Sequence, residues 1–109
     1  MDGYEDQISE AMKCAEEGKF SKAESICQKI LLDQPGNFEG RHLAAYISIL
    51  KGEWDKAINS LLQLIAEKGD DPAIYLTLAT AYRMKNSPDE NVACFRRVLQ
   101  LEPKDVDIL

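Results

Sequence analysis

The sequence contains few side chains that could bind a metal ion or act as a nucleophile. It has one histidine, His42, and three cysteines, Cys14, Cys27 and Cys94. A zinc site needs cysteines and histidines at short, regular spacings, and these four residues do not have them. The sequence also has no Ser/His/Asp set, no pair of carboxylates typical of a catalytic cleft and no glycine-rich phosphate loop. It therefore predicts a protein that is not an enzyme and that needs no metal or other cofactor.

The three cysteines are better explained by packing than by chemistry. Cys14 and Cys27 fall among apolar residues at helical spacing, so we expect both to be buried free thiols. Cys94 is followed by Phe95, and we expect it to be half-buried. An odd number of core-type cysteines is typical of a reducing compartment, which predicts a cytoplasmic location.

Length and charge narrow the choice of partners. The chain has 109 residues, enough for one domain, and a net charge of -6. Its first 37 residues hold eight acidic and four basic side chains, and no basic stripe occurs anywhere. We therefore expect no nucleic-acid partner. Since the sequence has no run of 18 apolar residues, we also expect no membrane span.

A repeat with a period of about 34 residues organises the whole sequence. The segment Gly18-Lys19-Phe20-Ser21-Lys22-Ala23 returns one period later as Gly52-Glu53-Trp54-Asp55-Lys56-Ala57. After a second period of the same length the glycine and the aromatic residue have become Asn86 and Pro88. A fixed period of this length is typical of helical solenoids, whose units are helix hairpins that cannot bury their apolar faces alone.

Apolar residues at helical spacing predict six helices and an all-α fold. Gly18 and Gly52 are expected to end the first and third helices, and Asp70 or Asp71 to cap the fifth. Pro103 is expected to end the sixth helix. The predicted ranges are about 4–17, from near Ser21 to before Gln34, 38–51, 54–67, 72–85 and 88–101.

These features resemble the tetratricopeptide repeat family. That family's unit has a small residue midway along its first helix and a glycine-x-aromatic-x-x-alanine turn into its second. In the second unit these residues are Ala45, Gly52, Trp54 and Ala57. The resemblance implies one domain, a right-handed α-solenoid of three helix-turn-helix repeats at about 4–37, 38–71 and 72–105. Two departures are Gly69 in place of a closing proline, and Asn91 where the contact between helices is expected to hold an alanine.

The resemblance also implies a concave groove lined by the first helix of each unit. Some family members bind a peptide's C-terminal carboxylate there, but none of the matching residues here can donate a hydrogen bond to one: Ile8, Met12, Leu43, Ala73 and Leu76. We instead expect an apolar groove for an amphipathic helix of a partner protein. Alternatively, much of this stripe packs between neighbouring helices. The candidate partner-binding residues are Ile8, Met12, His42, Leu43, Tyr46, Ile49, Leu50, Leu76, Arg83 and Met84.

The repeat frame continues past Pro103, and residues 106–109 look like the start of a further helix. Without that helix, an apolar end surface is expected at Leu78, Tyr82, Phe95, Val98 and Leu99. This leaves two interpretations open. The chain is the substrate-recruiting, N-terminal part of a larger enzyme, such as a glycosyltransferase, or a second copy covers the open end and gives a homo-oligomer.

Overall fold

A computed structural model describes residues 3–102 of the chain. Within this range the chain forms six α-helices and no strand, which confirms the predicted all-α fold. Pro103 and the further helix predicted from residue 106 lie outside the described residues. The predicted helix ends agree with the observed ones to within one or two residues. The helices are α1 (Glu5–Glu16), α2 (Phe20–Asp33), α3 (Phe38–Leu50), α4 (Trp54–Lys68), α5 (Pro72–Met84) and α6 (Pro88–Leu101).

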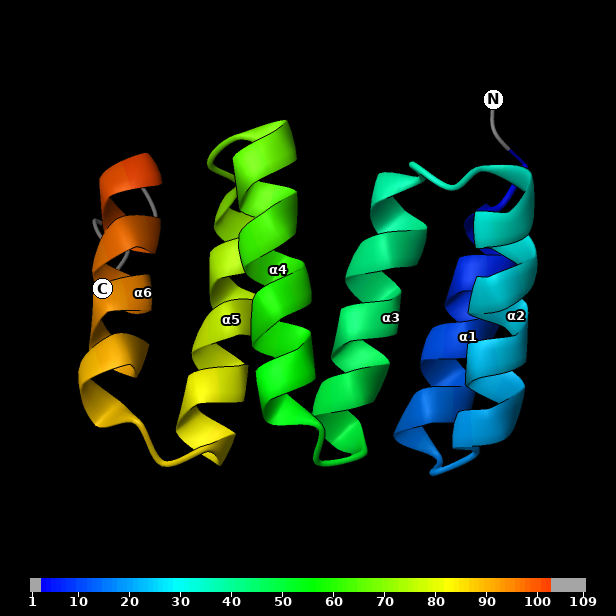
Figure 1. Cartoon of the computed structure of the whole chain (residues 1–109), viewed down its shortest axis with the longest axis horizontal. Coiled ribbons are helices and arrows are strands. Elements are labelled where there is room, and N and C mark those ends of the chain that lie inside the picture. The colour runs from blue at the N-terminus through cyan, green and yellow to red at the C-terminus, as the bar shows by residue number, and fades with distance from the viewer. Residues whose placement is uncertain (1–2, 103–109) are drawn as a thin grey trace.

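The helices form three successive hairpins that lie side by side (Figure 1). Each helix packs against the next one along the chain, and α3 also packs against both α1 and α5. In the described part of the chain the backbones of α2, α4 and α6 do not approach one another closely. The helices α1, α3 and α5 therefore make one continuous layer, and the other three helices pack against it as a second layer. None of these helices is both long and apolar enough to cross a bilayer.

The three turns inside the hairpins share one structure. Gly18, Gly52 and Asn86 occupy the same position in successive repeats, and their φ angles of 82°, 86° and 65° are all left-handed. The residue after each donates its N–H to a carbonyl five positions back, as Glu53 does to Ser48 at 2.8 Å. This is the Schellman motif, which ends a helix and turns the chain. Because asparagine tolerates left-handed φ better than most residues, the third hairpin keeps the turn without a glycine.

The turns between hairpins are closed by side-chain caps. Asn37 accepts a hydrogen bond from the Gly40 N–H at 2.7 Å and so caps α3. Asp71 accepts one from the Ala73 N–H at 2.9 Å and so caps α5. Of the two aspartates predicted as caps of the fifth helix, Asp71 is therefore the one that caps it.

The core consists of two apolar clusters that meet at α3. Leu43 and Ile47 pack into a cluster with buried residues of α1 and α2. Ala45 and Ile49 pack into a larger cluster with residues of α4, α5 and α6. The sequence prediction placed Ile49 on the binding surface, and this is wrong, since its side chain is only 2% exposed. The apolar residues around most of α3 therefore have a structural cause: this helix is buried on two sides.

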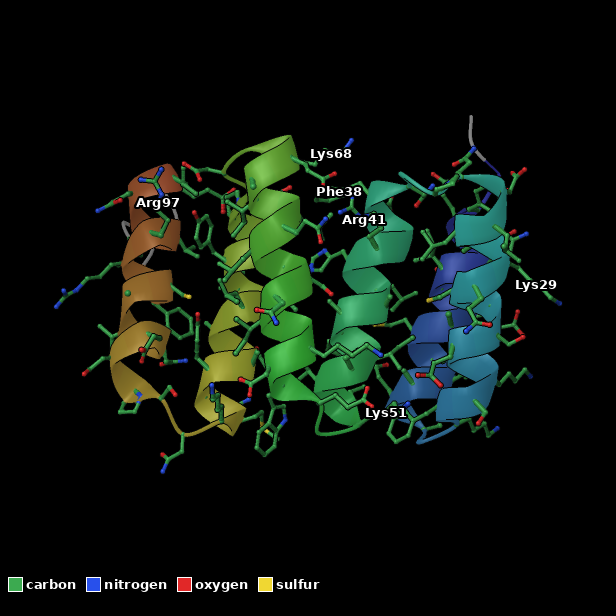
Figure 2. All side chains as sticks on the ribbon, viewed as in Figure 1. Lys29, Phe38, Arg41, Lys51, Lys68 and Arg97 are labelled. Carbon is green, nitrogen blue, oxygen red and sulfur yellow. The ribbon has the colours of Figure 1, made fainter. Side chains whose placement is uncertain are left out.

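Ion pairs connect the helices at the surface, and Figure 2 labels three of the basic residues that form them, Arg41, Lys51 and Arg97. The Arg41 guanidinium donates two hydrogen bonds to Glu67, at 2.8 and 2.9 Å, and so links α3 to α4. Lys51 donates to Glu24 at 2.8 Å and joins the second hairpin to the first. On α6, Arg97 forms an ion pair with Asp70 in the turn before α5. Exposed pairs such as these contribute about 0–1 kcal/mol each, so the apolar clusters are the main source of stability.

The last hairpin differs from the sequence prediction in its degree of burial. Cys94 was expected to be half-buried but lies in the core, and Leu78 and Val98 are buried rather than part of an open end. Asn91 replaces the expected alanine without loosening the hairpin, because its side chain donates a hydrogen bond to the Ala79 carbonyl at 2.8 Å. The exposed large apolar residues of α6 lie at i, i+3 and i+7, namely Val92, Phe95 and Leu99.

Candidate functional site

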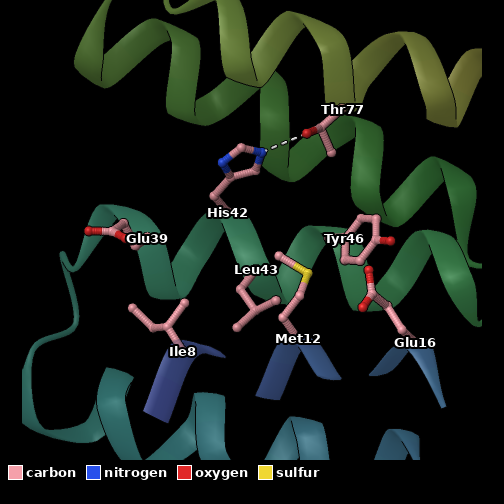
Figure 3. A pocket seen from close by; sticks show the side chains of 8 residues that line it. All are labelled: Ile8, Met12, Glu16, Glu39, His42, Leu43, Tyr46 and Thr77. Carbon is pink, nitrogen blue, oxygen red and sulfur yellow. Dashed lines mark hydrogen bonds between the residues drawn. The ribbon is translucent and has the colours of Figure 1, made fainter. Parts of the chain in front are cut away.

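A groove with a volume of about 360 Å³ runs between α1 and α3 and reaches α5 (Figure 3). Apolar side chains from the two helices face each other across it, with Ile8 and Met12 on α1 and Leu43 and Tyr46 on α3. It belongs to the layer formed by α1, α3 and α5, where the family resemblance implied a groove. The complete lining is Ile8, Met12, Glu16, Glu39, His42, Leu43, Tyr46 and Thr77.

The structure brings together half of the residues predicted to bind a partner. Ile8, Met12, His42, Leu43 and Tyr46 line the groove, with Leu43 buried at its floor. The others do not line it: Ile49 lies in the core, whereas four residues are exposed elsewhere on α3 and α5, namely Leu50, Leu76, Arg83 and Met84. The stripe therefore partly lines the groove and partly lies in the core, and its binding of a partner stays a prediction.

Three polar residues of the groove were absent from the predicted binding set. Glu16 lies at one end of the groove and Glu39 at the other, and Thr77 extends into it from α5 (Figure 3). The available signal was their position on the first helix of each repeat, on the side that faces the groove. The predicted binding set was chosen mainly for apolar character, so these groove-facing polar residues were left out of it.

His42 is held inside the groove by a hydrogen bond to α5. Its Nε2 lies 2.7 Å from the Thr77 Oγ1. The Thr77 hydroxyl donates to the Ala73 carbonyl at 3.1 Å, so it accepts from the His42 Nε2–H. This assigns the proton of the neutral ring to Nε2 and leaves Nδ1 as an acceptor. Phe38 packs against the same ring edge-to-face, with the ring centroids 6.1 Å apart.

Burial of His42 predicts a pH-dependent stability. Burial lowers the pKa of its imidazole, and the nearby Asp71 and Glu39 carboxylates oppose this only in part. The contribution of the neutral His42 imidazole to the free energy of unfolding is complete above its pKa in the unfolded chain, about 6.5. This contribution is lost as the pH falls towards the lower pKa that His42 has in the folded protein. We expect the urea midpoint to decrease between pH 7.5 and 5.5, and to decrease less in His42→Gln, since His42 is the sole histidine. Equal decreases in both proteins would contradict this assignment.

The cysteines do not contribute to the groove. All three are free thiols in the core, as predicted for Cys14 and Cys27. Burial, with a smaller effect from Glu24, raises the pKa of the Cys27 thiol to about 11, so the reactive thiolate is scarce near neutral pH. Within residues 3–102, no three His, Cys, Asp or Glu side chains lie close enough together to hold a metal ion.

Stacked hairpins with a groove along one layer define a helical-repeat protein. Comparison with known families gives the particular one: the family model described as tetratricopeptide repeat matches residues 15–82, which is more than half of the chain. The chain belongs to the tetratricopeptide repeat family. The matched segment contains the whole of α2, α3 and α4. It also contains the turns at Gly18 and Gly52, from which the resemblance was inferred.

Two curated proteins are similar to most of the chain. The tetratricopeptide repeat protein 21B of Homo sapiens is 31% identical over 99 residues, which are 90% of this chain and 7% of that protein. The beta-barrel assembly-enhancing protease of Yersinia pestis is 26% identical over 99 residues, which are 91% of this chain and 20% of that protein. The chain thus spans a small part of each relative. Similarity to one segment of a protease does not indicate a catalytic role for this chain.

Proposed function

We propose that this chain is a non-catalytic protein-interaction module whose groove binds the apolar face of an amphipathic helix from a partner protein. The observation that supports this most directly is the groove itself, which is open to solvent although Ile8, Met12, Leu43 and Tyr46 line it. Apolar surface of this kind is typical of interaction sites. Tetratricopeptide repeats typically serve protein–protein interaction, and the match to that family supports the same conclusion.

The groove suits a helix better than a C-terminal carboxylate. No lysine or arginine is among its lining residues, so a carboxylate would have no cation to pair with. Met12 is flexible and 37% exposed, and Tyr46 offers both a ring and a hydroxyl. Such side chains can pack around leucines that recur on one face of a helix.

A peptide-binding measurement tests this proposal. The probe is a fluorescent helical peptide with leucines at i, i+1, i+4 and i+5 and glutamine at its other positions. We expect Met12→Asp to weaken binding at least tenfold, or about 1.4 kcal/mol, because the charge would be buried against the leucines. The matched control is Leu62→Asp, at an exposed apolar residue of α4 that does not line the groove. If the wild-type protein does not bind the peptide, or both variants weaken binding equally, the proposal is wrong.

Self-association through α6 is a second candidate. The exposed residues Val92, Phe95 and Leu99 form one face of that helix, and a second copy could cover it. Light scattering over a concentration series tests this candidate, which a monomer at every concentration would exclude. The role as a recruiting segment of a glycosyltransferase stays a prediction, since neither relative is named as one. The division into three repeats of one domain and the cytoplasmic location also stay predictions.

A further inference from the structure

Each end of the groove carries one carboxylate. Glu16 and Glu39 lie at opposite ends, with Ile8, Leu43 and Met12 between them (Figure 3). In the described part of the chain neither carboxylate has an ion-pair partner. By contrast, acidic residues that join helices elsewhere form ion pairs. These pairs are Glu24 with Lys51, Asp55 with Lys85, Glu67 with Arg41 and Asp70 with Arg97.

Between its ends the groove offers acceptors and no cation. His42 uses its Nε2–H for Thr77, which leaves Nδ1 as an acceptor. The Asp71 carboxylate lies close enough to His42 to influence its protonation, and so adds negative charge beside the groove. No lysine or arginine lines the groove. An apolar floor with a carboxylate at each end is complementary to an apolar helix face that has a basic residue at each end.

The spacing of the two carboxylates gives the spacing of their partners. Glu39 is equivalent to position 5 of the first repeat, so Glu16 lies 11 positions further along the repeat unit. The helices α1 and α3 run in the same direction, because α2 returns between them (Figure 1). At 1.5 Å per residue this offset is about 16 Å measured along the helix axes, or three helical turns. Two residues of a bound helix that are 11 positions apart lie at the same distance on one face.

We propose that the groove selects a cationic amphipathic helix, with Lys or Arg at i-3 and i+8 flanking apolar anchors at i, i+1, i+4 and i+5. Glu39 and Glu16 receive one basic residue each, and the anchors pack on Met12, Leu43 and Tyr46. This inference rests on the proposed function, because it specifies the partner of the same groove.

The test uses three peptides with identical leucine anchors and with lysine, glutamine or glutamate at i-3 and i+8. In about 50 mM salt we expect the lysine peptide to bind about tenfold more tightly than the glutamine peptide, and the glutamate peptide to bind most weakly. The difference should shrink in about 0.5 M salt, since exposed charge pairs are screened. The measurement is fluorescence anisotropy of each labelled peptide.

Paired double variants separate the groove ends from the overall negative charge. Glu16→Gln with Glu39→Gln should remove the preference for lysine, whereas Asp89→Asn with Glu90→Gln, on α6, removes the same charge and should retain it. Circular dichroism establishes that both variants are folded. If wild type binds the three peptides equally, or both double variants lose the preference, the inference is overturned and the groove function remains. If no peptide binds, the proposed function is overturned as well.

Discussion

Replacing Leu61 with alanine is expected to lower the free energy of unfolding by about 2–5 kcal/mol. The Leu61 side chain on α4 is 0% exposed and belongs to the cluster that joins α3, α4, α5 and α6. Removing it leaves a cavity among side chains such as Ile74 and Leu78, which can fill that space only in part. The measurement is a urea titration followed by circular dichroism at 222 nm, with the m-value compared between variants.

The neighbouring residue provides a control for this substitution. Leu62 lies on the same helix but is 45% exposed, so Leu62→Ala makes the same chemical change without opening a core cavity. We expect it to change the free energy of unfolding by about 0.5 kcal/mol or less. Comparable losses in the two variants would show that the cost comes from α4 itself and not from the cluster around Leu61.

The fold was predictable because its information is local and repeated. Gly18 and Gly52 readily adopt the left-handed backbone that ends a helix, and Asp71 and Pro72 favour the start of one, so helix boundaries could be read without tertiary contacts. The constant repeat period then indicated that the hairpins stack. The chain departs from the glycine pattern at Asn86, yet the turn is the same because asparagine adopts the same conformation.

The groove was less predictable because α3 is apolar around most of its circumference. Ile49 and Leu50 are adjacent, and a rotation of about 100° along the helix places one in the core and leaves the other exposed. A pattern of apolar residues cannot assign these two positions when both are apolar. The groove also does not follow the repeat along the whole layer, since Leu76 and Met84 lie outside it although their repeat equivalents, Ile8 and Glu16, line it.

Enlarging Ala79 tests why small residues recur midway along the first helix of each repeat. Ala79 on α5 is fully buried in the larger cluster, and its carbonyl accepts the hydrogen bond from Asn91 of α6. A leucine side chain there would push α5 and α6 apart, because a packed core cannot absorb the added volume. We expect Ala79→Leu to lower the free energy of unfolding by about 1–3 kcal/mol, measured by the same urea titration.

The matched variant Ala73→Leu makes the same change on an exposed position of α5. Alanine and leucine have similar helix propensities, so this variant should be nearly neutral, within about 0.5 kcal/mol. A loss confined to Ala79→Leu would mean that the close approach of α5 and α6 requires the small side chain. If Ala79→Leu is also neutral, the two helices can separate without cost, and the recurring alanine needs an explanation other than close packing.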